Sequence, residues 1–250
     1  MSEHIEKRRE GAVLSLVLAR PEKKNALTAA MYDALSLAFA EANRADDIGA
    51  ILISGKGGVF TAGNDIGDFL RAVGSPDASP GVRFLHALNG LERPLVAAVE
   101  GPAIGIGTTL CFHCDLVYAA PTTRFQMPFV DLALVPEAAS SLLAPRRFGM
   151  ARAAQALLLA EPFDAAEACR LGLINAVVET DALYAHALDK AKALAAKPRA
   201  ALLATRKLLR GDTNVIKARM AEENRAFGQA VRSDEARAIF SAFLQKTKAS

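Results

Sequence analysis

Two short loops carry backbone groups that could stabilise a reacting carbonyl. The first loop spans Phe60–Ile66 and the second spans Gly101–Gly107, and each follows an apolar, strand-like run. Neither loop contains a Ser or Cys nucleophile, so what they offer is bare backbone N–H groups. Two such loops aimed at one point form an oxyanion hole, which stabilises negative charge developing on a carbonyl oxygen.

A single acid downstream of these loops is the natural candidate for moving protons. It is Glu137, in the stretch Val135–Ser141. Taken alone, a Glu after a Pro at a helix start is favoured by helix-dipole electrostatics without any function. The pair Asn64-Asp65 in the first loop is likewise a common turn pair when taken alone. The functional interpretation therefore depends on the loops and the acid together.

The composition indicates a folded protein with ample core. The chain has 250 residues, of which 52% are apolar and 23% charged, so we expect one large domain, with or without a small appendage. A net charge of +3 gives no argument for nucleic-acid binding. No apolar run approaches a membrane span, and the polar residues 1–7 do not resemble a secretory signal, so the expected location is cytoplasmic.

Metal and thiol chemistry are not expected. The three cysteines are Cys111, Cys114 and Cys169, an odd and small number that suggests reduced thiols. The run from Cys111 to Cys114 lacks the further ligands of a zinc site, so both are expected to be buried helix thiols. The four histidines are scattered along the chain, which favours neither a metal cluster nor a histidine-based triad.

Three common motifs are excluded by their missing residues. The second loop has Gly105 and Gly107 but Leu110 where a dinucleotide-binding loop needs its third glycine. No Lys follows these glycines, which excludes a phosphate-binding Walker loop. The pair Ser140-Ser141 lacks the flanking glycines of a nucleophile elbow and more simply serves the first turn of a helix.

The N-terminal half alternates strands with helices, the pattern of an α/β fold. A polar break at 20–25 precedes Thr28, which is expected to cap an amphipathic helix ending near Arg44, with Met31, Leu35, Leu37 and Phe39 facing inward. A hairpin is expected over 3–9 and 12–19, further strands over 50–53, 95–99, 116–119 and 124–127, and helices over 81–91 and from the second loop to 114.

The chain becomes mostly helical beyond residue 138. After a short helix capped by Asp164 and one more strand over 173–178, we expect helices over 181–195, 198–209, 213–230 and 233–244. A change of character near 196 divides the chain into a core domain, 1–195, and a helical C-terminal region, 196–250. That region is short for a core of its own, so it should pack on the main body or on a neighbouring subunit.

Taken together, these segments resemble the enoyl-CoA hydratase/isomerase, or crotonase, superfamily over nearly the whole chain. The ordered set is specific although no fragment is decisive: Pro21-x-x-x-Asn25-Ala26-Leu27, Phe60-x-Ala62-Gly63-x-Asp65-Ile66, Ala98-Val99-x-Gly101-x-Ala103-x-Gly105-x-Gly107, Cys114-Asp115, Arg124-Phe125 and Ala168-x-x-x-Gly172-Leu173-Ile174. The resemblance implies an α/β spiral of ββα units with a helical C-terminal trimerisation region, assembled as a homotrimer or a dimer of trimers.

The resemblance also implies site residues. The N–H groups of Asn64 and Ile106 would form the oxyanion hole for an acyl-CoA thioester, and Glu137 would be the catalytic acid. The CoA-binding residues would be Lys24, Ala62, Gly63, Asn64, Asp65, Ile66, Gly105 and Ile106. The basic residues between Lys192 and Arg219 would supply charges near the CoA phosphates, although solvated helix faces explain them equally well. Coenzyme A would be part of the substrate, with no separate cofactor and no metal.

Departures from the hydratase pattern indicate the subclass. Hydratases of this family carry one Glu where this chain has Thr109, and a second after the proline of the Arg-Phe strand, where Phe129 follows Pro128. The remaining acid, Glu137, resembles that of the Δ3,Δ2-enoyl-CoA isomerases. The sequence therefore predicts double-bond migration through a dienolate, with one Glu as proton shuttle. The alternatives are a hydratase or another crotonase reaction, such as isomerisation of a ring-derived acyl-CoA, and a non-catalytic acyl-CoA-binding protein.

Overall fold

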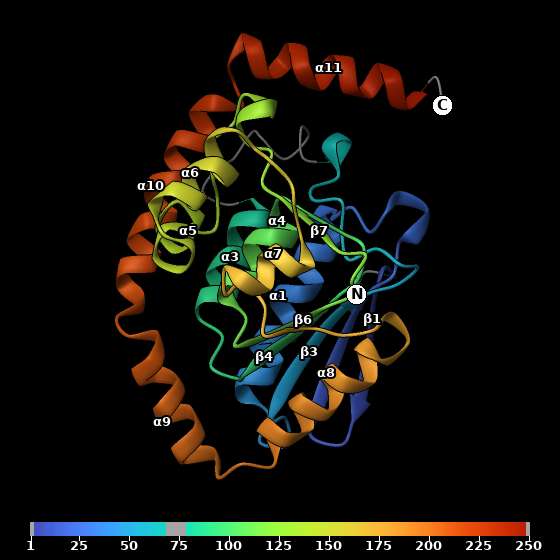
Figure 1. The fold of residues 1–250 in the computed structure, drawn as a ribbon, viewed down its shortest axis with the longest axis vertical. Helices are drawn as coiled ribbons and strands as arrows, with labels where there is room; N and C mark the ends of the chain where they lie inside the picture. Colours follow the sequence, from blue (N-terminus) through green and yellow to red (C-terminus); the bar gives the residue numbers. More distant parts are fainter. Residues whose placement is uncertain (1–2, 69–78, 249–250) are drawn as a thin grey trace.

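A mostly parallel six-stranded sheet forms the centre of the protein. The computed structural model describes residues 3–68 and 79–248. Strands β1 (Ile5–Glu10) and β2 (Val13–Leu18) form the expected antiparallel hairpin, and β3 (Ala50–Gly55), β4 (Leu95–Val99), β6 (Leu116–Ala119) and β9 (Ala176–Val177) extend it in parallel. The strand order is β1-β2-β3-β4-β6-β9. The α/β class read from the sequence is confirmed (Figure 1).

A second, smaller sheet is formed by strands that alternate along the chain with the later strands of the large sheet. Its strands β5 (Pro102–Ile104), β7 (Arg124–Gln126) and β8 (Phe163–Asp164) lie in the order β5-β7-β8. Isolated bridges, Leu27 to Asn64 and Thr61 to Ala103, extend this smaller sheet toward the N-terminal loops. The chain passes from β4 to β5 and then into helix α4 (Ile106–Thr109), so successive units climb as a spiral.

Helices cover both faces of the large sheet. Helices α1 (Ala29–Arg44) and α3 (Pro80–Asn89) pack together on one face, and α8 (Thr180–Ala195) lies on the other (Figure 1). The strand residues are therefore buried on both sides, which explains why β2, β3 and β4 read as continuous apolar runs. Thr28 caps α1 as predicted, because its side chain accepts a hydrogen bond from the N–H of Met31.

Two expectations from the sequence are wrong in detail. Leu37 was expected to face the core of α1, but it is 66% exposed. Its neighbours Leu35 and Phe39 fill the buried side of the helix, and Leu37 lies about 200° from Leu35 around the axis. The strand expected over 173–178 shortens to β9, because the N–H groups of Leu173 and Ile174 bond back to the carbonyl of Ala168. Those bonds close the preceding helix instead.

The remaining elements are short helices followed by a long helical tail. The predicted helix ending at 114 is α4 followed by a 3₁₀ turn, η3 (Leu110–His113). The other elements are η1 (Pro21–Lys23), η4 (Val130–Leu132), α5 (Ser140–Phe148), α6 (Met150–Leu158), α7 (Ala165–Arg170), α9 (Arg199–Arg210), α10 (Thr213–Ala230) and α11 (Asp234–Lys248).

The C-terminal helices pack on the body of the same chain. Helix α10 contacts α3 and α5, and α11 contacts η4. Figure 1 shows α9 and α10 running down one side of the molecule, with α11 across one end. The division of the chain at 195/196 stays a prediction. Within the described ranges, no helix is long and apolar enough to cross a membrane.

Candidate active site

The two loops singled out in the sequence lie side by side. The N–H of Thr61 donates to the carbonyl of Pro102 at 3.0 Å, and the N–H of Ile104 donates to the carbonyl of Thr61 at 3.0 Å. Gly63 has a φ of +93°, and a Cβ there would lie 3.1 Å from the carbonyl oxygen of Ile104. The close approach of the loops thus explains why a glycine stands at this position.

The N–H groups of Asn64 and Ile106 are not used by the scaffold. Two hydrogen bonds form the bridge around Asn64. The N–H of Leu27 donates to the carbonyl of Gly63 at 2.8 Å, and the N–H of Asp65 donates to the carbonyl of Leu27 at 2.9 Å. The N–H of Asn64 itself takes no part in this bridge. Ile106 is the first residue of α4, where an N–H has no acceptor within the helix. In the part of the chain that the structure describes, neither N–H has a hydrogen-bond acceptor.

Several predicted ligand-binding residues support the loops through other contacts. Lys24 is exposed, and its carbonyl accepts from the N–H of Ala62 at 2.9 Å. Asp65 forms an ion pair with Arg20 at 2.7 Å. Ile66 is partly buried and packs against the hydrophobic core. None of these side chains lines the cavity described next, so any role in CoA binding stays a prediction.

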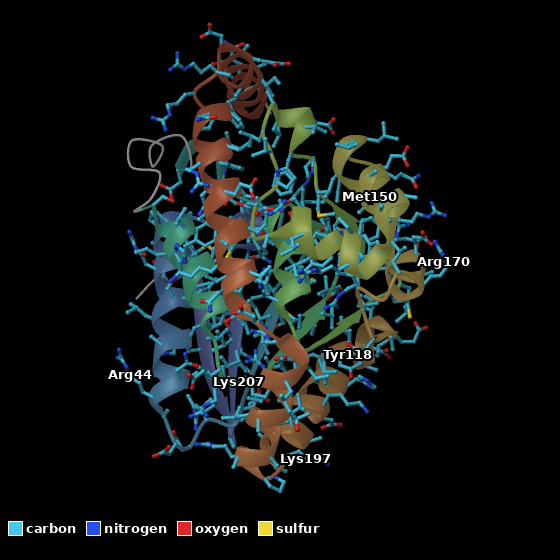
Figure 2. All side chains as sticks on the ribbon, turned by 90° about the vertical axis from the view of Figure 1, so that its left-hand side faces the viewer. Arg44, Tyr118, Met150, Arg170, Lys197 and Lys207 are labelled. Carbon is cyan, nitrogen blue, oxygen red and sulfur yellow. The ribbon has the colours of Figure 1, made fainter. Side chains whose placement is uncertain are left out.

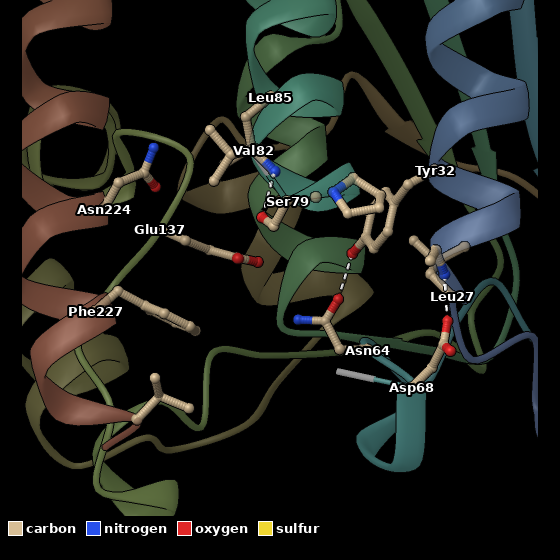
Figure 3. A pocket seen from close by; sticks show the side chains of 15 residues that line it. Leu27, Tyr32, Asn64, Asp68, Ser79, Val82, Leu85, Glu137, Asn224 and Phe227 are labelled. Carbon is tan, nitrogen blue, oxygen red and sulfur yellow. Dashed lines mark hydrogen bonds between the residues drawn. The ribbon is translucent and has the colours of Figure 1, made fainter. Parts of the chain in front are cut away.

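A largely apolar cavity lies between α1, α3, α10 and the loop that carries Glu137. Both Asn64 and Glu137 line it, together with apolar side chains such as Leu85 and Phe227. Figure 3 shows the carboxyl group of Glu137 pointing into the cavity from one side and Asn64 lying on the other. The structure therefore brings the predicted acid and one of the two predicted loops to the same space. Ile106 is only 1% exposed and is not part of the lining.

The environment of Glu137 favours its protonated form near neutral pH. Its Oε1 atom is shielded from solvent and has no hydrogen-bond partner among the residues that the structure describes. Burial raises the pKa of Glu137 to about 7, and the negative charge of Glu223 adds to this increase. The sequence left open whether apolar neighbours or a helix N-terminus would dominate, and desolvation dominates. A carboxyl group with such a pKa can both accept and return a proton.

An unusual backbone holds Glu137 in place. The next two residues, Ala138 and Ala139, have φ angles of +59° and +56°, a left-handed conformation that non-glycine residues seldom adopt. The N–H and Oγ of Ser140 both donate to the carbonyl of Glu137, at 3.0 and 2.6 Å. His113 donates from Nε2 to the carbonyl of Ala138 at 2.8 Å. Burial lowers the pKa of His113 to about 4, so this ring is a neutral, structural donor.

Tyr32 is a site residue that the sequence did not reveal. Its hydroxyl donates to Oδ1 of Asn64, and the ring lines the cavity (Figure 3). Burial raises the pKa of Tyr32 well above its ordinary value, and the charge of Glu137 raises it further. Its only sequence signal was a polar-tipped aromatic residue on the inward face of α1, which is also what an ordinary core tyrosine looks like.

Three arginines of the late basic segment are structural. Arg206 pairs through Nε with Asp115 at 2.9 Å and bonds the carbonyl of Leu91 at 2.7 Å. Arg210 donates to the carbonyl of His113, and Arg199 to that of Ile48. These contacts tie α9 to the body. Two lysines of this segment, Lys197 and Lys207, lie at the surface (Figure 2), and a role near CoA phosphates stays a prediction for them.

The positions that hold acids in hydratases are part of the core here. Thr109 is 0% and Phe129 is 5% exposed. Cys111 and Cys114 are buried, as expected, and burial raises the pKa of Cys111 to about 12. Among residues 3–68 and 79–248, no cluster of three or more His, Cys, Asp and Glu side chains could hold a metal ion.

Comparison with known proteins gives the family and supports the fold. The family model described as "Enoyl-CoA hydratase/isomerase" matches residues 8–250. The chain is 34% identical over 207 residues to rat (Rattus norvegicus) "Enoyl-CoA delta isomerase 2", covering 80% of this chain but only 53% of that protein. It is 36% identical to "Probable enoyl-CoA hydratase" of Rhodobacter capsulatus, covering 92% of this chain and 91% of that one.

A solved structure extends the agreement to three dimensions. The structure of Pseudomonas aeruginosa OdaA superposes with a TM-score of 0.94 at 42% sequence identity, covering 97% of this chain and 99% of that chain. Relatives named as an isomerase and as a hydratase thus each match most of the length of this chain, 80% and 92%. The chain belongs to the enoyl-CoA hydratase/isomerase family and has its crotonase-like spiral fold.

Proposed function

We propose that this protein shifts the double bond of a 3-enoyl-CoA to give a 2-enoyl-CoA. The observation that carries the proposal is Glu137, a carboxyl group with a pKa of about 7 that faces a largely apolar cavity beside Asn64. An acid in this state can take up a proton from one carbon and deliver it to another at neutral pH. Hydration would use a second acid, because one carboxylate activates the attacking water and the other acid supplies the proton to C2.

The proposed reaction uses one base and two N–H donors. Ionised Glu137 removes a proton from C2 of the substrate, and the electron pair passes through the thioester to its oxygen, giving a dienolate. The N–H groups of Asn64 and Ile106 hold that negative charge, and each such donor lowers the barrier by about 3 kcal/mol. Glu137 then returns its proton to C4 as the charge flows back. Coenzyme A is the carrier portion of the substrate, so the reaction uses no separate cofactor.

The hydratase alternative rests on the names of relatives, because some share over nine-tenths of this chain's length. Against it stand Thr109 and Phe129, which are buried at the two positions where hydratases carry their acids. A parallel assay with 2-enoyl-CoA and 3-enoyl-CoA separates the two reactions. We expect turnover of the 3-enoyl substrate. Hydration of the 2-enoyl substrate at a higher kcat/KM would favour the hydratase.

Replacement of Glu137 by Gln tests the role of the base. Gln keeps the size of the side chain but cannot take up a proton, so isomerase activity should be lost while acyl-CoA binding, measured by calorimetry, is retained. Undiminished turnover by this variant would refute the assignment. A wild-type protein that binds acyl-CoA tightly and converts no enoyl substrate would instead be the non-catalytic acyl-CoA-binding protein.

The proposed assembly is a homotrimer or a dimer of trimers. Leu208 and Leu209 on α9 are each 83% exposed, and Met150 on α6, labelled at the surface in Figure 2, is 72% exposed. Apolar side chains this exposed indicate surfaces that a partner covers. Light scattering should give a mass of three or six chains, and Leu208→Glu should reduce it. A wild-type monomer would contradict this assembly.

A further inference from the structure

A second buried acid, Glu223 of α10, contacts the loop that carries Glu137. Glu223 is only 5% exposed. Its carboxylate accepts hydrogen bonds from the N–H of Ala139 at 2.6 Å, the N–H of Ser141 at 3.0 Å and the Oγ of Ser141 at 2.6 Å. All these donors lie two to four residues after Glu137. Hydrogen bonds to an ionised acceptor are stronger than neutral ones, so this is a tight attachment between α10 and the loop.

The loop needs such an attachment because its backbone is strained. Ala138 and Ala139 are both in the left-handed region, which is unfavourable for residues that carry a Cβ. Two consecutive residues of this kind persist only when their surroundings fix them. Glu223 bonds the N–H of the second one, and His113 bonds the carbonyl of the first. The direction in which Glu137 points therefore depends on contacts outside its own loop.

The two carboxyl groups have different surroundings. Burial raises the pKa of Glu223, and its hydrogen bonds from Ser141 and Ala139 oppose that increase because they favour the charged form. Among the described residues, Oε1 of Glu137 receives no such bond. When two acids interact, the one with donors holds the charge and the other keeps the proton. Consistent with this, the charge of Glu223 raises the pKa of Glu137. In this pair Glu223 is the acid that holds the charge, and Glu137 is the acid that can exchange a proton.

We propose that Glu223 is the positioning residue for Glu137: it fixes the strained loop from α10 and places a second carboxylate next to the loop that carries the proton-transferring acid. This inference rests on the proposed function of Glu137. Glu223 itself does not line the cavity, whereas its neighbour Asn224 and Phe227, one turn further along α10, do. The helix that forms one wall of the cavity thus also holds the base.

Other charged or titratable groups around Glu137 do not replace this role. From α3 the cavity receives apolar side chains, Val82 and Leu85. Burial raises the pKa of Glu223, and the charge of Arg219, which donates to the Oγ of Ser141 at 3.3 Å, partly opposes that increase. The remaining groups are Tyr32 from α1, Asp68 at the cavity edge and neutral His113 behind the loop.

Glu223→Gln tests the proposal, with Glu222→Gln as its matched control. Gln removes the charge and accepts on one oxygen only, so it cannot satisfy both Ala139 and Ser141. Glu222, the preceding residue of α10, has a side chain 63% exposed and pairs with Arg219 at 3.2 Å, so its replacement changes the charge of the helix equally without touching the loop. The first measurement is the infrared carboxyl band that disappears in Glu137→Gln, followed against pH in substrate-free protein.

The proposal predicts different behaviour for the two variants. In Glu223→Gln the Glu137 band should titrate at a lower pH than its wild-type midpoint of about 7, and kcat should fall roughly tenfold to a hundredfold with little change in KM. Glu222→Gln should match the wild type in both. A Glu137 midpoint that is the same in both variants overturns the electrostatic role. A shifted band in a protein with no isomerase activity would leave the acid pair intact and refute only the proposed function.

A milder variant keeps the proposal testable if Glu223→Gln does not fold. Ser141→Ala removes the 2.6 Å hydroxyl donor and keeps both carboxylates. We expect this variant to fold and to have a lower kcat with little change in KM. The pH midpoint of the Glu137 band should not move lower, because the charge of Glu223 remains. Wild-type kcat in this variant would contradict the attachment of the loop by Glu223. A fall in the midpoint like that of Glu223→Gln would contradict the electrostatic role.

Discussion

Glu137 should make the protein less stable as the pH rises, and its removal should reverse this. The carboxyl group has a pKa of about 7 in the folded protein against an ordinary value of 4.5. Below the lower value both states hold the proton, and there is no penalty. Between the two values the folded state binds the proton that the unfolded state has lost, so stability falls with rising pH. Above pH 7 the penalty levels off at up to about 3 kcal/mol, since each pKa unit is worth about 1.4 kcal/mol.

The assay is urea unfolding of wild type and Glu137→Gln at a series of pH values. Gln resembles the protonated carboxyl group in size and stays neutral, so the two proteins should be about equally stable in acid. As the pH rises past neutral, the free energy of unfolding of the variant should come to exceed that of the wild type. The difference should reach up to about 3 kcal/mol at alkaline pH. Glu222→Gln, whose side chain is 63% exposed, is the control and should show no such trend.

The same titration should appear in the kinetics. Because the reaction begins with ionised Glu137, kcat/KM of the wild type should rise with pH and level off above about 7, where the loss of stability also levels off. A stability difference between wild type and Glu137→Gln that does not depend on pH would refute the reasoning. A wild type that becomes more stable than Glu137→Gln as the pH rises would refute it too, since that is the behaviour of an acid whose pKa is lowered in the folded state.

Three further substitutions test the loops and the cavity. Tyr32→Phe removes the hydroxyl that bonds Asn64, so it should lower the free energy of unfolding by about 1 kcal/mol in chemical denaturation and lower kcat more than KM. Gly105→Ala should reduce kcat strongly, because the backbone of Gly105, at φ 55° and ψ −115°, disfavours a side chain where the second loop enters α4. Gly172→Ala is the control: Gly172 also has a positive φ but does not line the cavity, so this variant should keep the wild-type kcat. Phe227→Ala removes apolar surface from the cavity and should raise KM roughly tenfold in steady-state assays.

The framework of the fold could be predicted from local signals. The cap at Thr28 and the continuous apolar runs of β2, β3 and β4 each have one dominant physical cause, and the structure confirms them. Leu37 was misplaced because helical periodicity tolerates apolar residues on either side of the inward face. The strand over 173–178 was overestimated because hydrogen bonds back to Ala168 compete with strand pairing, and they depend on a neighbouring helix end.

The site was only partly predictable, for a different reason. Glu137 and the two loops could be found because their spacing matches a known family. Glu223 could not, because nothing in the sequence distinguishes it from its exposed neighbour Glu222, and its role arises from a contact with Ser141 that is 82 residues away along the chain. Tyr32 could not be predicted either, because only the fold brings its partner Asn64 next to it.

The two halves of the proposed site are built by different parts of the fold. The N–H donors at Asn64 and Ile106 follow directly from the spiral, because the bridge between Thr61 and Ala103 places the ends of successive units next to each other. The acid is carried by a separate loop, which Glu223 attaches to α10. Since no hydrogen bond among the described residues links the Glu137 loop to the two N–H loops, an acid can change position without disturbing them.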